Sequence, residues 1–103
     1  MKISIITANY NNEATLKACF DSVSDQTYTN IEHIIIDGAS NDGSMDIIKA
    51  YAKLPFVKYF SAKDDGIYDA LNKGIKRASG EVIGFLHADD MFASNQTVQN
   101  IVA

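Results

Sequence analysis

The sequence predicts an α/β fold, a mainly parallel sheet of about four strands flanked by helices. Short runs of β-branched apolar residues alternate along the chain with segments in which apolar residues recur every three or four positions. Parallel strands need crossover connections, and helices of this kind commonly supply them. The chain has 103 residues, of which 47% are hydrophobic and one is proline. This length and composition predict one folded domain with a real core and leave no room for a second.

Four segments are expected to form strands. They are residues 2–8, 31–37, 57–61 and 81 to 86 or 87. The third is the weakest, because it is short and half polar. The fourth is apolar almost throughout, which is typical of a strand buried on both faces. We therefore expect the fourth strand to lie at the centre of the sheet.

Each expected strand is followed by a segment of helical period. Asn12 is the expected N-cap of the first helix, the second begins near residues 42–43, the third stops at residues 79–80, and residues 94–95 cap the last. The inward-facing residues are Leu16, Cys19, Phe20 and Val23 in the first helix, Ile47, Ile48 and Tyr51 in the second, Ile67, Leu71, Ile75 and Ala78 in the third, and Val98, Ile101 and Val102 in the last.

The sequence finishes inside the last expected helix, without a closing strand. We therefore expect a truncated fold, a piece of a larger α/β protein, although a self-standing domain of this size is also compatible with the pattern. The chain has no internal repeat and no linker.

The formal charge of -4 argues against nucleic acid as a partner, because nucleic-acid binders present basic patches to phosphates. The one cysteine, Cys19, lies among apolar helix positions and is expected to be a core residue in a reducing compartment. The first residues lack the pattern of a signal peptide, and no apolar run reaches the roughly 20 residues of a spanning helix. A cytoplasmic protein is expected, with membrane association through other segments of a full-length enzyme left open.

Polar and acidic residues follow every expected strand. They are Asn9 to Asn12 after the first, Asp37 to Asp42 after the second, Asp64 and Asp65 after the third, and His87, Asp89 and Asp90 after the fourth. In a parallel sheet these positions share one crevice, where ligands bind. Several carboxylates in one crevice repel one another unless a cation offsets the repulsion. Mg²⁺ or Mn²⁺ would do so and could also bind a diphosphate, whereas aspartates after strands are also common turn residues.

Other nucleotide and metal motifs are absent or incomplete. The segment after the first strand has no glycine, which argues against a dinucleotide site and against a sugar-1-phosphate nucleotidyltransferase. A P-loop fails because Ser44 stands where the lysine is needed. His33, His87 and Cys19 are too scattered for a zinc site, and His33 is expected to be a hydrogen-bonded residue inside a strand.

Three runs carry a resemblance to a known family: SIITANYNN, IEHIIIDGASNDGS and DDGIYDALNKGIKRASGEVIGFLHADD. Their order and spacing resemble the N-terminal, nucleotide-sugar-binding half of the family 2 glycosyltransferases, which have the Rossmann-like GT-A fold. The likeness covers residues 2 to about 92.

The resemblance implies a nucleotide site. It places Tyr10 near the base, with Thr7 or Ala8 beside it, and aromatic contact with a base is physically sensible. It also gives Asp37 a hydrogen bond from the base and brings Asp64 near the nucleoside.

Two departures from the family pattern bear on this site. A frequent D-D-G-S run reads D-G-A-S here, so that Gly38 leaves Asp37 as its only acid. Where relatives commonly carry Asp-x-Asp, this chain has His87-Ala88-Asp89, followed by Asp90. The resemblance then implies a ribose contact for His87 and a metal ligand in Asp89. Asp90 is expected either to join Asp89 on the metal or to cap the next turn.

The implied reaction is transfer of a sugar from a nucleoside diphosphate, UDP in the first place, to a hydroxyl of a glycan or lipid-linked acceptor, with inversion. The catalytic base of such enzymes lies in the second half, so it is expected beyond Ala103 and no catalytic residue is assigned. The alternative is a non-catalytic folded fragment or interaction module, able to self-associate through an uncovered sheet edge or apolar surface.

Overall fold

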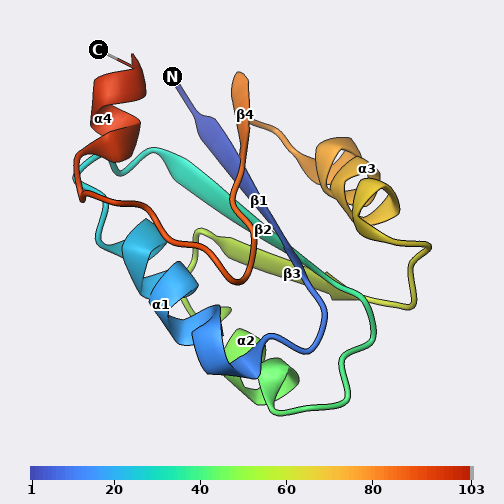
Figure 1. The fold of residues 1–103 in the computed structure, drawn as a ribbon. Coiled ribbons are helices and arrows are strands. Elements are labelled where there is room, and N and C mark those ends of the chain that lie inside the picture. The colour runs from blue at the N-terminus through green and yellow to red at the C-terminus, as the bar shows by residue number, and fades with distance from the viewer. Residues whose placement is uncertain (103) are drawn as a thin grey trace.

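A computed structural model describes residues 1–102. They form a four-stranded parallel sheet in the order β3-β2-β1-β4, which confirms the predicted fold class. The strands are β1 (Ile3–Asn9), β2 (Ile31–Asp37), β3 (Val57–Ser61) and β4 (Val82–Phe85). Figure 1 shows the sheet as a middle layer with helices on both sides.

The described residues hold four helices: α1 (Glu13–Ser24), α2 (Ser44–Tyr51), α3 (Ile67–Arg77) and α4 (Thr97–Val102). The first, second and fourth cover one face of the sheet, and α3 alone covers the other (Figure 1). Within residues 1–102 no helix is long and apolar enough to cross a membrane.

The predicted position of the fourth strand is wrong. The central strands are β1 and β2, and all seven residues of β2 are buried. β4 lies at the edge of the sheet, with Val82, Ile83 and Phe85 between 37% and 51% exposed. The apolar composition of a strand therefore does not by itself determine its place in the sheet.

The buried faces of the helices follow the sequence pattern unevenly. All four predicted residues of α1 are buried, including Cys19, where burial raises the pKa of the thiol to about 11. In α3, however, Ile67 and Ile75 are each 42% exposed, whereas the predicted Leu71 and Ala78 pack partly buried against the core. The buried residues of α3 are Ala70 and Gly74. Gly74 has no side chain because a Cβ there would collide with the Ile6 side chain on β1.

One further prediction about the helices is wrong, and another is confirmed only in part. Ile101 in α4 is 65% exposed instead of facing inward. Asn12 is the N-cap residue of α1, as predicted, but its side chain makes no capping hydrogen bond. Instead the Glu13 N–H donates to Asp42 Oδ2 (3.1 Å), and the Gly43 N–H donates to Glu13 Oε1 (2.9 Å). The starts of α1 and α2 therefore cap each other across the structure, which no local pattern predicts.

A buried carboxylate fixes the opposite end of the sheet. Glu32 on β2 accepts hydrogen bonds from Ser4 Oγ (2.8 Å), the Ser79 N–H (3.0 Å) and Lys58 Nζ (2.9 Å). Burial by itself raises the pKa of Glu32, but the hydrogen bonds from Lys58, Ser79 and Ser4 outweigh burial and lower the pKa from 4.5 to about 2. The charged form of Glu32 thus stabilises the fold and ties β1, β3 and the segment after α3 together.

We predict that Glu32→Gln lowers the free energy of unfolding at neutral pH by about 1–3 kcal/mol, because the lysine and the amide lose a charged acceptor. The folded-state pKa lies below the unfolded-state value, so this contribution is complete above pH 4.5 and is lost as pH falls toward 2. Urea unfolding across that range should therefore show a flatter acid dependence for the variant than for the unsubstituted chain.

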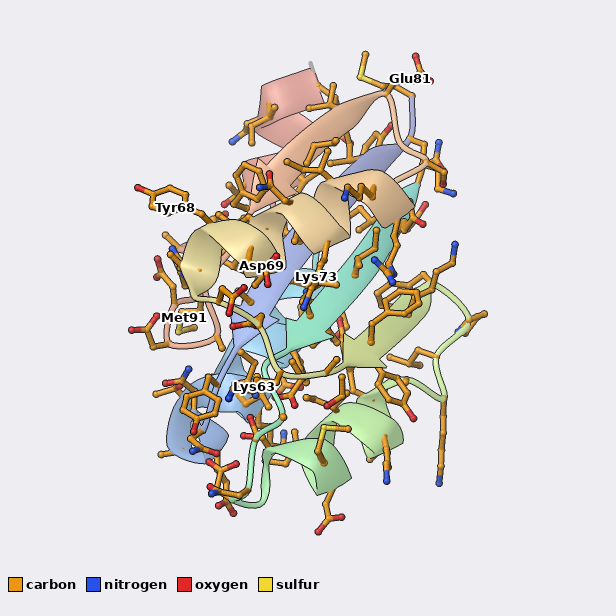
Figure 2. All side chains as sticks on the ribbon, turned by 90° about the vertical axis from the view of Figure 1, so that its right-hand side faces the viewer. Lys63, Tyr68, Asp69, Lys73, Glu81 and Met91 are labelled. Carbon is orange, nitrogen blue, oxygen red and sulfur yellow. The ribbon has the colours of Figure 1, made fainter. Side chains whose placement is uncertain are left out.

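The matched control is Glu81→Gln (Figure 2). Glu81 is an exposed glutamate two residues after Ser79, which donates to Glu32. The control should unfold like the unsubstituted chain. Equal stability of Glu32→Gln and the control at neutral pH would contradict the role given to Glu32.

Candidate functional site

A cleft of about 600 Å³ opens at the carboxyl ends of the strands. Its walls come from the segments that follow β1, β2, β3 and β4 and from the first turn of α3. The lining residues are Ala8, Asn9, Tyr10, Asn12, Gly38, Ala39, Lys63, Asp64, Gly66, Ile67, Ala70, His87, Ala88 and Asp89. The parallel sheet brings these segments together because all four strands end at the same edge.

Five of the residues predicted for the site line this cleft: Ala8, Tyr10, Asp64, His87 and Asp89. Tyr10 is 60% exposed, so its ring is available to a ligand. His87 and Asp89 follow β4 and are also exposed. One wall of the cleft therefore carries an aromatic ring, and the others carry two carboxylates and an imidazole.

Thr7 does not line the cleft. It is fully buried on the sheet face covered by α1 and α2, and its hydroxyl lies 2.8 Å from His33 Nε2. His33 Nδ1 lies 2.8 Å from the Tyr51 hydroxyl, and burial lowers the pKa of His33 to about 3. Thr7 thus holds the neutral imidazole of His33 in the core. This confirms the prediction that His33 is a hydrogen-bonded residue inside a strand.

Asp90 is exposed, and its Oδ1 accepts a hydrogen bond from the Met91 N–H (2.8 Å). It lies beside the cleft lining but is not part of it. Of the two uses predicted for Asp90, the structure brings it to the turn.

Asp37 is also absent from the cleft lining, and its side chain is fully buried. Its Oδ1 accepts from Asn9 Nδ2 (2.7 Å) and Ser40 Oγ (2.6 Å), and its Oδ2 accepts from the Ser40 N–H (3.0 Å) and Ser61 Oγ (2.8 Å). Burial raises the pKa of Asp37, but hydrogen bonds from Ser40, Asn9 and Ser61 outweigh burial and lower it. Asp37 therefore joins the ends of β1, β2 and β3.

Sequence reasoning did not assign Lys63 to the site. It is the only lysine or arginine among the described residues that line the cleft, and Figure 2 shows it on the segment between β3 and α3. Its place just after a predicted strand was the available signal. Several other missed residues, such as Gly38, Gly66 and Ala70, are small and carry no chemical signal in the sequence.

The segment that carries Lys63 and Asp64 is held by α3. The Gly66 N–H donates to Asp64 Oδ1 (3.2 Å), and Gly66 has a φ of 108°, which glycine adopts without strain. Lys73 Nζ donates to the Lys63 carbonyl oxygen (3.2 Å) and lies 3.3 Å from Asp69 (Figure 2). Helix and loop together orient the Asp64 carboxylate toward the cleft.

A divalent cation fits the cleft only in company with a ligand. No group of three His, Cys, Asp or Glu side chains that could hold a metal occurs within residues 1–102. Mg²⁺ sites commonly use one or two carboxylates and complete their coordination with substrate phosphates and waters. Asp89 in the cleft supplies a donor of that kind, so the residues present are compatible with a cation that arrives with a diphosphate.

The sequence model of glycosyl transferase family 2 matches residues 4–103. The chain therefore belongs to glycosyl transferase family 2.

Two relatives illustrate the match. The Bacillus subtilis protein EpsH, to which a glycosyltransferase function is provisionally assigned, is 39% identical over 89 residues, which are 85% of this chain and 26% of EpsH. A PGL/p-HBAD biosynthesis glycosyltransferase of Mycobacterium tuberculosis is 35% identical over 102 residues, which are 97% of this chain and 40% of that protein. The chain thus spans well under half the length of these relatives.

Solved structures confirm the GT-A fold. The mannosyltransferase PcManGT from Pyrobaculum calidifontis, in complex with GDP-Man and Mn²⁺, superposes with a TM-score of 0.91 at 24% identity over 98% of this chain and 31% of its own. S. aureus TarS 1–349 in complex with UDP-GlcNAc has the same TM-score and identity over 99% of this chain and 30% of its own.

We predict that Ala39→Gly stabilises the protein by about 0.5–1 kcal/mol, because an L side chain in the left-handed region is strained and glycine is not. Ala39 has a φ of 62° at the rim of the cleft. Thermal unfolding should show a raised midpoint. The control, Ala62→Gly, lies in the next rim segment without a positive φ and should be destabilised instead; the same sign for both variants would contradict the strain at Ala39.

Proposed function

We propose that this chain forms the donor-binding part of an enzyme that transfers a sugar from a nucleoside diphosphate to an acceptor hydroxyl with inversion. We take UDP as the nucleotide of the donor. The observation that carries the proposal is the convergence of Tyr10, Asp64, His87 and Asp89 on one cleft at the carboxyl ends of the strands. Membership of glycosyl transferase family 2 supports sugar transfer in general.

The residues that line the cleft suit the parts of a nucleotide sugar. Tyr10, more than half exposed, offers a ring face for the base, and Ala8 leaves room beside it. Toward β4, His87 is available for a hydrogen bond to the ribose. Lys63 offers positive charge that the otherwise acidic cleft needs for a diphosphate.

Asp89 would hold a divalent cation, Mg²⁺ or Mn²⁺, together with the diphosphate, and Asp90 would assist if its turn rearranged. When bound, the cation would stabilise the charge that develops on the leaving diphosphate. The Mn²⁺ in PcManGT supports this part of the proposal. The residues of this chain then bind and orient the donor, while Lys63 shares the charge of the phosphates.

We place the acceptor site and the base outside this chain. The chain corresponds to 40% or less of the two relatives described, which supports this placement. A glycan or lipid-linked acceptor and a role in cell-surface polysaccharide biosynthesis at the cytoplasmic side are the context we propose for the whole enzyme.

A second candidate is a non-catalytic interaction module. It is favoured by the apolar residues left exposed on β4 and α3, including Ile67, Ile75, Ile83 and Phe85. The unpaired edge of β4 could join a second copy of the chain, and a homo-oligomer would then form without any nucleotide.

We predict that the chain binds UDP more tightly with Mn²⁺ than without it, and that Asp89→Asn removes this difference. The loss of a charged ligand should weaken binding in Mn²⁺ roughly tenfold. Isothermal titration calorimetry with UDP, with and without Mn²⁺, measures both effects.

Asp46→Asn is the control, because Asp46 is an exposed aspartate on α2 outside the cleft. Metal-dependent binding that survives Asp89→Asn would remove Asp89 from the metal site. No binding of UDP under either condition would favour the interaction module.

We also predict that the chain of 103 residues does not transfer sugar by itself, because we place the acceptor site and the catalytic base outside it. A radiolabelled transfer assay with UDP-sugars and glycan acceptors should give no product, even where UDP binds. Sugar transfer by the isolated chain would contradict the proposal that the acceptor site and the base lie outside it.

A further inference from the structure

We propose that Asp64, through the space left open by Gly38, selects the nucleobase, and that Asp37 is a positioning residue behind it. The preferred base carries a ring N–H beside a carbonyl, as uracil and guanine do. This inference rests on the proposed nucleotide site and names the group that the site recognises.

Asp37 has no capacity to read a ligand. Both of its oxygens accept two hydrogen bonds within the protein, from Asn9, Ser40 and Ser61, and no part of its side chain is exposed. A ligand donor could reach it only by displacing a buried partner, which would leave that partner unsatisfied. Its contacts instead fix the segments that end β1 and β2 and line the cleft.

Gly38, the next residue, lies on the wall of the cleft and faces Asp64. A Cβ added to Gly38 would lie 3.0 Å from Asp64 Oδ2 and 3.4 Å from Oδ1. Gly38 does not have a positive φ, so its backbone does not require glycine. The absence of a side chain therefore serves the carboxylate of Asp64, which occupies the space that a side chain at position 38 would take.

The surroundings of Asp64 suit a flat ring. Ala8, Gly38 and Ala70 bring two strand ends and α3 to the cleft with little or no side chain. Tyr10 stands in the same cleft with most of its ring exposed. A planar base can thus lie against Tyr10 with its edge toward Asp64.

The hydrogen bonds of Asp64 define what that edge must offer. Oδ1 accepts from the Gly66 N–H at 3.2 Å, which leaves Oδ2 without a protein donor among the described hydrogen bonds. A carboxylate accepts and does not donate. Uracil N3 and guanine N1 carry a hydrogen. The corresponding ring nitrogens of cytosine and adenine are acceptors that the carboxylate would repel, even where the neighbouring amino group donates to it.

The test compares two nucleotides of the same size. We expect the chain to bind UDP more tightly than CDP in Mn²⁺, and Asp64→Asn to reduce the ratio of the two affinities roughly tenfold or more. The asparagine keeps an oxygen that accepts from the Gly66 N–H, but its amide NH₂ can also donate a hydrogen bond to cytosine N3. GDP should weaken with UDP in this variant, and UDP methylated at N3 should bind poorly to the unsubstituted chain.

Three further variants separate recognition from structure. Gly38→Ala should lower the ratio of UDP affinity to CDP affinity although residue 64 stays aspartate, because the added methyl group pushes against Asp64 Oδ2. Asp65→Asn, a neighbouring exposed carboxylate outside the cleft, should leave the ratio unchanged. Asp37→Asn should lower the unfolding temperature and weaken UDP and CDP alike, so that their ratio is preserved.

UDP binding with an unchanged ratio in Asp64→Asn overturns this inference and leaves the proposed function intact. If the ratio of UDP affinity to CDP affinity shifts in Asp37→Asn and not in Asp64→Asn, Asp37 selects the base. That result would also overturn this inference. If no nucleotide binds the unsubstituted chain, the proposed function falls and this inference falls with it.

Discussion

The buried carboxylate of Asp37 is the constraint on which the site depends. A charge with no exposure is tolerable only if donors surround it, and the donors come from Asn9 at the end of β1, Ser61 at the end of β3 and Ser40 in the turn after β2. The hydrogen bonds to this one carboxylate therefore hold the ends of three strands next to one another. The cleft lies directly beyond those ends, so Asp37, which is not part of the cleft lining, helps to position the residues that are.

The two faces of the sheet are covered unequally. Three helices pack on one face, whereas α3 alone lies on the other (Figure 1). Ile67 and Ile75 on α3 are each 42% exposed. β4 beside it keeps both of its faces partly open. β4 and α3 thus leave apolar side chains partly exposed on this side of the sheet.

Local patterns predicted the strands 31–37 and 57–61 with the bounds that the structure has, and they predicted the buried face of α1. They failed where distant segments decide. The order of the strands depends on which partners β1 accepts, and the inward face of α3 depends on how closely Gly74 lets it approach Ile6. In the site, the positions of Asp89 and Tyr10 were predictable because each follows a strand. The burial of Asp37 was not, because it depends on donors from Asn9, Ser40 and Ser61 that meet only in the folded chain.

The reciprocal contact between Glu13 and the Asp42–Gly43 segment has a consequence for how the chain folds. Neither α1 nor α2 has a side-chain cap from its own N-cap residue, although Asp42 accepts locally from the Ser44 N–H. Helices of 12 and 8 residues are marginal in isolation. The Glu13 and Gly43 N–H groups find their side-chain acceptors only after some 30 intervening residues have been brought round and β1 lies beside β2. Helix formation and strand pairing on this side of the sheet are thus one cooperative event, and a peptide cut from either helix would be largely unfolded.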